Sequence, residues 1–503
     1  MSGASYTQIG QLSSDGNWRW DGASWRPVAS EGASLPRWLN LKLKDKPTWL
    51  TLGAALAVGL LADQALRVGT FGLAASLTLA FIAAALVFAT PAGSLEARML
   101  AGASILFAAW MTLRASPWLL WPDLAMSFAL IGSAASLVTR GSLLDIGIAE
   151  AAARSVHAFV HGATGAPFAF QPLVRARSRM AVIAPVARGA LIAAPIAALV
   201  AVLLAAADPV FASFFNLNFD VGRLALDLTF VAAGSLVAAG LLRLAAAEPL
   251  SRVDGPAWRL GTIEGLVVLA VLDAIFAAFA VAQAIAATGA AGDVLRAAGV
   301  TYADYARSGF FQLLWVAGIA AVTLILFSRI TSLTERTTKR AFQVLSLVAI
   351  GLTILIVFVA FQRLRIYEEA YGFTMLRLYS HIFAVWIALI FLLLAADLAG
   401  LFKRRRWLVG AASVSAMAVL LALNFVNPEA IVVSLNIDRA QATHKIDAQY
   451  LATLSNDATP TLVAADSPDI RRIACEGPRS YSAGPAAFNW SDATAATSRR
   501  GRC

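Results

Sequence analysis

Eleven long apolar stretches divide the chain, and Lys and Arg concentrate in every second gap between them. A helix needs about 20 apolar residues to cross the hydrocarbon core of a bilayer. Because that core holds no water, each crossing segment must hydrogen-bond its own backbone, as an α-helix does. The pattern therefore predicts an all-α integral membrane protein, a polytopic bundle of about eleven transmembrane helices. The predicted spans are Trp49–Leu66, Gly69–Thr90, Ala97–Leu113, Pro117–Val138, Ala184–Ala207, Leu224–Ala246, Ile263–Thr288, Gly309–Ile330, Ala341–Gln362, Tyr379–Gly400 and Trp407–Val426.

Composition supports this class of protein. The chain is 59% hydrophobic and 14% charged, whereas soluble domains average roughly 45–50% apolar and about 25% charged residues. The net charge of +10 could indicate a nucleic-acid partner. The basic residues lie beside the spans, however, where they set topology and contact anionic headgroups. We therefore expect the lipid bilayer as partner, with anionic lipids at the basic cytoplasmic loops, and no nucleic acid.

The distribution of basic residues predicts the orientation. With the N-terminus in the cytoplasm, the inside segments carry 23 Lys and Arg and the short outside connections carry 8. Short loops are the ones that obey the positive-inside rule. We expect a multi-pass protein of the bacterial inner membrane with a cytoplasmic N-terminus and an extracytoplasmic C-terminus. The first apolar run begins only near Trp49, so no cleavable signal peptide is expected.

Three regions follow from this topology. Residues 1–47 form a cytoplasmic tail, residues 48–426 the transmembrane domain with a cytoplasmic amphipathic loop at 139–183, and residues 427–503 an extracytoplasmic tail with short helices, disordered after about 478. In the N-terminal tail, Trp18, Trp20 and Trp25 flank an Asp-Gly pair typical of a type I′ hairpin turn. An isolated hairpin is marginally stable, so we expect this one to contact a protein partner. The C-terminal tail is a second candidate surface for such a partner. A disordered N-terminal tail is the alternative to the hairpin.

Both cysteines, Cys475 and Cys503, lie in the predicted outside tail. That compartment permits disulfides, which makes the two residues a candidate pair. Two unpaired thiols in a frayed tail are the alternative. Reduced and non-reduced mobility would distinguish these states.

Asp273 is the strongest charge predicted inside a span. An ionised Asp near the bilayer centre costs at least about 2.5–3.5 kcal/mol, so its side chain should face the bundle interior or water. It is a candidate proton or cation site. A neutral Asp that hydrogen-bonds between helices is the alternative.

The predicted outside connections combine tyrosines, arginines and carboxylates, which together could bind an anionic headgroup or a sugar. The candidates are Asp208, Tyr302, Asp304, Arg307, Arg363, Glu368, Tyr371 and Arg377. Ion pairs that only fix the loops are the alternative. His157 and His161 share a helix face but lack a third ligand, so no metal, cofactor or catalytic residue is predicted.

Three blocks of sequence resemble bacterial membrane families known only as domains of unknown function, of the DUF4173 and DUF4153 kind. They are the stretch Tyr302–Phe311, the segment Tyr371–Tyr379, and the tail from Asn436-Ile437-Asp438-Arg439 to Asp457-Ala458. The N-terminal tail is similar to a short WDGxxW motif of bacterial membrane proteins. The resemblance implies a polytopic membrane protein with an extracytoplasmic tail and no assigned activity.

These observations favour a non-enzymatic protein that binds or senses a ligand at the outer face, or that transports a small solute. An envelope enzyme that acts on a lipid-linked substrate is one alternative. A structural membrane scaffold is another. A cavity at the outer face, or a water-lined path to Asp273, would discriminate among them.

Overall fold

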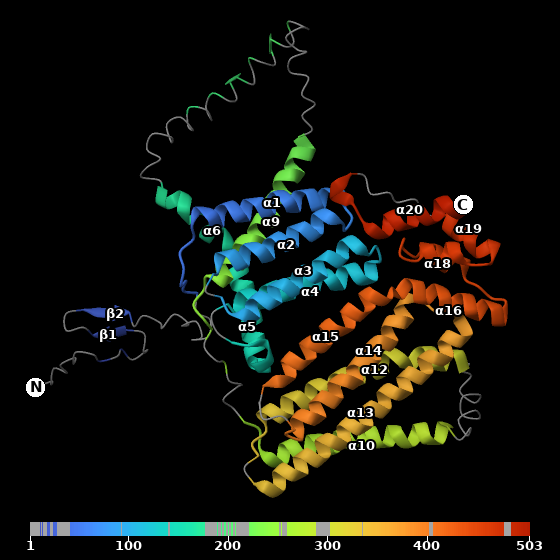
Figure 1. The fold of residues 1–503 in the computed structure, drawn as a ribbon. Helices are drawn as coiled ribbons and strands as arrows, with labels where there is room; N and C mark the ends of the chain where they lie inside the picture. Colours follow the sequence, from blue (N-terminus) through green and yellow to red (C-terminus); the bar gives the residue numbers. More distant parts are fainter. Residues whose placement is uncertain are drawn as a thin grey trace, which may run out of the picture.

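The computed structural model is a predominantly helical molecule in which two helix bundles lie side by side and a set of short helices covers one end (Figure 1). The structure describes residues 18–20, 24–27, 41–91, 93–138, 141–176, 221–250, 259–287, 302–333, 335–401, 406–476 and 484–503, with isolated positions between these ranges. Near the N-terminus, strands β1 (Trp18–Trp20) and β2 (Trp25–Pro27) pair as an antiparallel hairpin. The predicted Asp-Gly turn between them lies outside the described residues.

The first bundle packs long helices from the N-terminal half around one apolar core. Its members are α1 (Trp49–Val68), α2 (Leu73–Ala89), α3 (Leu95–Leu113), α4 (Pro117–Ser136), α5 (Ile148–Ala163), α6 (Gly165–Arg175) and α9 (Val221–Ala245). Helices α1 and α9 approach most closely at two glycines. A Cβ on Gly59 would lie 2.4 Å from the Val231 carbonyl oxygen, and one on Gly234 would lie 2.5 Å from Cβ of Ala62. Small residues permit this backbone contact between membrane helices.

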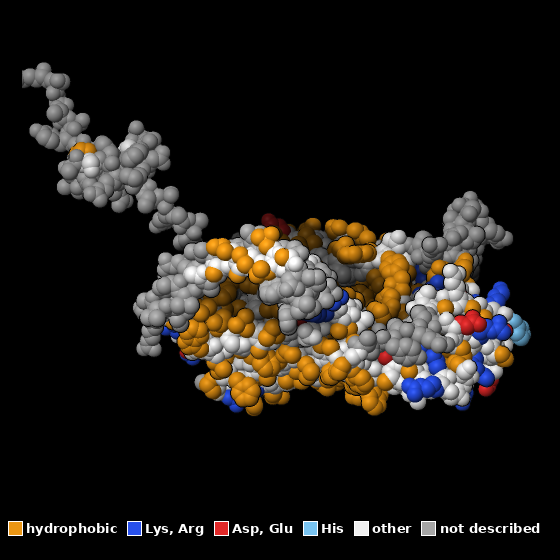
Figure 2. Space-filling model, turned by 90° about the horizontal axis from the view of Figure 1, so that it is seen from above, with side chains coloured by type: hydrophobic (Ala, Val, Ile, Leu, Met, Phe, Trp, Pro, Cys, Tyr) orange, Lys and Arg blue, Asp and Glu red, His pale blue; other side chains and the backbone are white. Residues whose placement is uncertain are grey.

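The second bundle has its own apolar core. Its members are α10 (Thr262–Ala287), α12 (Tyr302–Ile330), α13 (Arg336–Tyr371), α14 (Met375–Leu398) and α15 (Trp407–Val426). Helix α15 also contacts α4 and so joins the two bundles. Large apolar side chains remain exposed along the outside, as in the stripe of Trp315, Ile319 and Val322 on α12. Orange apolar surface accordingly covers much of the helical body in Figure 2, as expected of helices that face lipid.

Eight of the described helices are long and apolar enough to cross a membrane: α1, α4, α9, α10, α12, α13, α14 and α15. They coincide with eight of the eleven predicted spans. Two other predicted spans are helices as well, but α2 has 17 residues and α3 carries Glu96 in its first turn. The span predicted at Ala184–Ala207 lies largely outside the described residues. The prediction of an all-helical, multi-pass membrane protein is confirmed.

The described residues of the range 427–503 form a unit that we call the C-terminal cap. It consists of α16 (Pro428–Thr443), α17 (Ala448–Ala452), α18 (Thr459–Ala464), α19 (Pro468–Glu476), the short helix η3 (Pro485–Ala487) and α20 (Trp490–Arg502). The cap covers the ends of the long helices at the right of Figure 1. The predicted disorder after about residue 478 is wrong for residues 484–503: Asn489 caps α20 through the amides of Ser491 and Asp492, and a disulfide joins Cys475 to Cys503.

Candidate functional site

Buried polar side chains fasten the cap to the bundles. The Asp457 carboxylate is buried and accepts hydrogen bonds from the amides of Ala115 and Ser116, at 3.2 and 2.9 Å, where α4 begins. An acid at the N-terminus of a helix is stabilised by the helix dipole. The Asn489 side chain donates to the carbonyls of Met111 and Arg114 at the end of α3. The cap is therefore an integral part of the folded molecule.

Glu429 provides a second buried carboxylate within the cap. It accepts hydrogen bonds from the amide and hydroxyl of Ser455, at 2.9 and 2.7 Å. Burial raises the pKa of the Glu429 carboxyl above its ordinary value. Two turns further along α16, the Asn436 amide hydrogen-bonds both the amide and the carbonyl of Phe373, so α16 also holds the loop between α13 and α14.

A cavity of about 890 Å³ lies between the cap, the turn that joins α1 to α2, and the start of α4. Its size falls within the range of about 300–1,000 Å³ that is typical of ligand sites. The polar side chains in its lining include Gln64, Arg67, Ser455, Asn456, Asp492 and Arg499. We call this space the cap cavity.

The charged side chains that line the cap cavity, Arg67, Arg499 and Asp492, are held by polar or charged partners. Asn456 is the central residue, because its amide donates to Asp492 at 2.7 Å and accepts from Arg499 at 3.3 Å. Arg67 pairs with Asp63 at 2.9 Å and with Asp227 at 2.6 Å. Burial raises the pKa of Asp492 above its ordinary value. The lining thus offers neutral and paired groups rather than a cluster of cations.

An apolar crevice of about 430 Å³ adjoins the cap cavity. It lies between α1, α2, α4 and α9, and it shares Gly69, Thr70, Phe71 and Trp121 with the cap cavity. The rings of Phe71 and Trp121 meet edge to face at a centroid distance of 5.1 Å. A polar compartment and an apolar compartment therefore lie next to each other and share a wall at this end of the first bundle.

The structure brings four of the predicted site residues together at the junction of α13 and α14, away from the cap cavity. Glu368 is buried, and its carboxylate lies 3.3 Å from Nδ1 of His381. The Arg377 guanidinium lies 4.3 Å from the ring centroid of Tyr367, which in turn packs on the exposed Tyr371. The same end of α13 holds the fourth residue, Arg363, whose guanidinium donates to the Gln283 side chain at 3.4 Å.

A smaller cavity of about 270 Å³ lies beside this cluster and includes Arg377 in its lining. The other predicted residues are not brought together in the described structure. Tyr302, Asp304 and Arg307 belong to the first turns of α12, but their side chains lie outside the described residues, as does Asp208.

Asp273 lies in α10 within the second bundle and is 8% exposed. Its neighbours one turn away on either side, Leu269 and Phe276, belong to the apolar core. Neither carboxylate oxygen has a hydrogen-bond partner among the described residues. Asp273 does not line the cap cavity.

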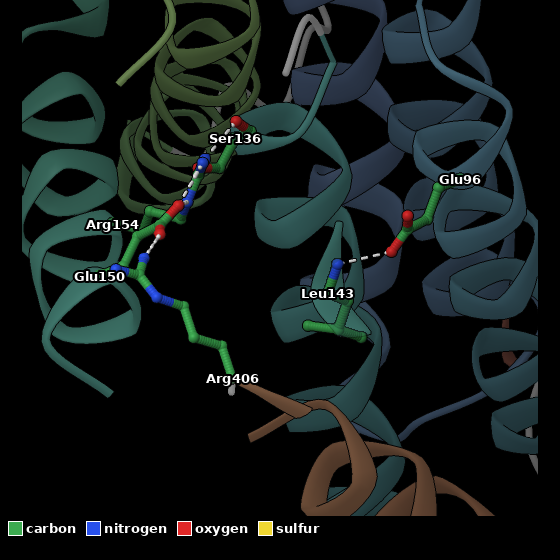
Figure 3. A network of polar contacts seen from close by, with 6 residues as sticks. All are labelled: Glu96, Ser136, Leu143, Glu150, Arg154 and Arg406. Atoms are coloured by element: carbon green, nitrogen blue, oxygen red, sulfur yellow. Dashed lines mark hydrogen bonds and ion pairs between the residues drawn. The ribbon is translucent and has the colours of Figure 1, made fainter. Parts of the chain in front are cut away.

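A buried ion network occupies the opposite ends of α3, α4 and α15 from the cap (Figure 3). Glu150 pairs with Arg154 at 2.9 Å and with Arg406 at 3.2 Å. Arg154 also donates to the carbonyl and hydroxyl of Ser136. Since Arg406 directly precedes α15, the network ties the loop between α4 and α9 to the second bundle.

Helix α5 is amphipathic, and it turns its polar face toward the bundles. Glu150, Arg154, His157 and His161 are buried, whereas Val156 is 45% exposed. The two His rings lie with their Nε2 atoms 3.1 Å apart. Among the described residues, no group of three or more His, Cys, Asp or Glu could hold a metal ion. Ion pairing and packing against α9 explain why the polar side is buried.

The fold and these sites define a polytopic α-helical membrane protein whose C-terminal cap borders a cavity. The chain belongs to the DUF4153 family, a domain of unknown function, whose model matches residues 101–465. No curated protein sequence matches the chain, and no solved structure does either. The family match runs from within α3 to the end of α18 and thus includes Asp457 and Asn456.

Sequence reasoning missed the residues of the cap cavity. Gln64 and Arg67 are more than 380 residues from Asn456 in the chain, and no motif links them. The weak signals were Asp227, charged near the end of a span, and the short polar turn after Arg67. Each of these has an ordinary topological explanation, so neither indicated a site.

Proposed function

We propose that this protein is a ligand-binding protein of the bacterial inner membrane and that the cap cavity is its binding site on the outer face. The observation that carries the proposal is the cap cavity itself, about 890 Å³, with amide, hydroxyl and paired charged groups in its lining. A scaffold would need no such space. The buried contacts of Asp457 and Asn489 hold one wall of the cavity against the other.

Two features support a cytoplasmic N-terminus and an external cap. Basic residues dominate the segments that this orientation places inside. The disulfide Cys475–Cys503 lies in the cap, and such bonds persist in oxidising compartments. In this orientation, the loop that carries Arg175 faces the anionic inner leaflet. The Trp hairpin or the cap surface is where a protein partner would bind.

The lining favours binding over catalysis. Glycoside hydrolysis, for example, uses two carboxyl groups about 5–9.5 Å apart. Asp492 is the one acidic side chain among the described residues that line the cap cavity. Glu368, the predicted site residue with a buried carboxylate, lies 3.3 Å from His381 and away from the cap cavity.

A thermal-stability screen tests the proposal on the full chain in amphipol, which avoids sugar-headed detergents. The probes are glycerol, glucose, maltose, glycerol 3-phosphate and phosphocholine. A ligand at a hundred times its Kd stabilises the protein by about 2.7 kcal/mol. We expect at least one probe to raise the Tm of the wild type. Absence of a shift with every probe would overturn the proposal.

A pair of matched variants localises the effect. Ala452 lines the cap cavity and is exposed, whereas the neighbouring Thr453 is exposed but does not line it. Ala452→Trp should abolish the shift and Thr453→Trp should preserve it. Equal shifts in both variants would place binding elsewhere.

The orientation has its own test. Alkaline phosphatase fused after Val426 should be active, because that enzyme requires the oxidising outer compartment for its disulfides. An inactive reporter that remains in the cytoplasm would contradict the proposed topology.

A further inference from the structure

We infer that the ligand of the cap cavity is a membrane lipid with an uncharged, hydroxyl-bearing head group. This inference rests on the proposed function and names its substrate class. The lipid's head would occupy the cap cavity and one of its chains the apolar crevice. Three observations support this inference: the two spaces share a wall, one is polar and the other apolar, and the charged groups of the polar space are paired.

The cap cavity and the apolar crevice share a border. Gly69, Thr70, Phe71 and Trp121 line both the cap cavity and the crevice. Gly69 ends α1 in the left-handed conformation, with φ of +68°, so the chain turns sharply between α1 and α2. The turn leaves the two compartments adjacent, and a ligand with a polar and an apolar part could occupy both.

The contrast between the two spaces matches an amphiphile. The crevice is lined mainly by aliphatic and aromatic side chains from four helices, such as Leu79, Leu124 and Val237. It lies along the cap-side halves of α1, α2 and α4, at the depth of acyl chains in one leaflet. Trp and other aromatic residues favour the boundary between apolar and polar zones of a membrane. Trp121 lies at that boundary here.

The pairing of the charged side chains in the cap cavity determines which lipid head group fits there. Phosphate sites in proteins rely on Arg side chains that offer several free donors. In the cap cavity, Arg67 is engaged by two carboxylates. Arg499 donates to the Ala474 carbonyl and to Asn456, which also holds Asp492. Hydroxyl groups can both donate and accept, so a sugar or glycerol head suits amides and paired ions better than a phosphate does.

Photolabelling in nanodiscs tests this assignment. The full chain is reconstituted in phosphatidylcholine with one of two probes that carry the same diazirine-labelled acyl chain: glucosyl-diacylglycerol or phosphatidylglycerol. We expect the glucosyl lipid to label peptides from α1, α2 or α4 that line the crevice, and to exceed phosphatidylglycerol by about tenfold, which corresponds to 1.4 kcal/mol. Equal or stronger labelling by phosphatidylglycerol would overturn the uncharged head group.

A filled crevice provides the matched control. Ala233 on α9 is exposed and lines the crevice, whereas Ala232 is exposed and does not. Ala233→Trp should reduce labelling by about tenfold, as expected when a bulky side chain occupies a binding space, and Ala232→Trp should leave it unchanged. Both variants should melt as the wild type does. Labelling that is absent in the wild type, or unaffected by Ala233→Trp, would refute the proposal that the ligand is a lipid. If soluble probes still raised the Tm, the proposal that the cap cavity binds a ligand would remain.

Discussion

Loss of the disulfide should release the end of the cap without unfolding the two helix bundles. The bond joins Cys475 at the end of α19 to Cys503 after α20, over a sequence separation of 28. A closed loop of this length stabilises the folded state by roughly 3–4 kcal/mol in the chain-entropy relation. Because about 1.4 kcal/mol changes an equilibrium tenfold, the double variant Cys475→Ser/Cys503→Ser should open α20 on the order of a few hundred times more often.

Hydrogen exchange followed by mass spectrometry measures this opening directly. The peptide 490–502 contains the buried residues Ala495 and Ala496, whose amides should exchange faster in the variant by that factor. Reductant should reproduce the effect in the wild type and add nothing in the double variant. A change of less than about tenfold would refute the reasoning, because the contacts of Asn489 and Arg499 would then hold α20 without the covalent link.

Three further predictions concern the buried polar groups. Asp457→Ala should lower the free energy of unfolding by about 1–3 kcal/mol for each amide left without its acceptor, measured by unfolding titration in mixed micelles; an unchanged midpoint would refute the capping role. Burial raises the pKa of Asp492, so the folded cap keeps this proton to higher pH than the unfolded chain, and stability present at low pH is lost as pH rises through that raised pKa. The Tm of Asp492→Asn minus the Tm of the wild type should therefore increase between about pH 4 and about pH 7. A difference that stays constant over this range would contradict the predicted sign. Glu150→Gln should cost about 3–5 kcal/mol, because it leaves the buried guanidinium of Arg154 without its carboxylate; the same titration measures it, and a cost below 1 kcal/mol would show that Ser136 alone suffices.

Local signals predicted much of the fold. The apolar runs gave most of the long helices, since a span must be helical and roughly as long as the membrane is thick. The start of the cap carries a local signal, because Asn427 and Pro428 have the residue types of an N-cap and a first helical position, and Asn427 does cap α16. Asp447 caps α17 in the same way. Each of these features depends on residues within a few positions of one another.

The helical structure of the C-terminal cap and the presence of the cap cavity depend on contacts between residues that are far apart in the sequence. The sequence after about 478 is rich in Ser, Ala, Gly and Arg, a composition typical of disorder. It is helical in residues 490–502 because Asn489 reaches α3 and Arg499 reaches α19. Glu150 and Arg154 could have been recognised as an i, i+4 pair, but not their pairing with Arg406. One sequence does not encode such partners in any visible pattern.

The contact of Asp457 with the start of α4 has a consequence for the order of synthesis. The amide of Ala115 is translated 342 residues before the carboxylate that accepts from it. At about 5–20 residues per second, the ribosome needs roughly 20–70 s to supply that partner. During this interval α3 and α4 are inserted but their shared end is unfinished. A chain that terminates before Asp457 lacks the acceptor for these amides, so the junction between α3 and α4 can reach its final structure only after residue 457 has been made.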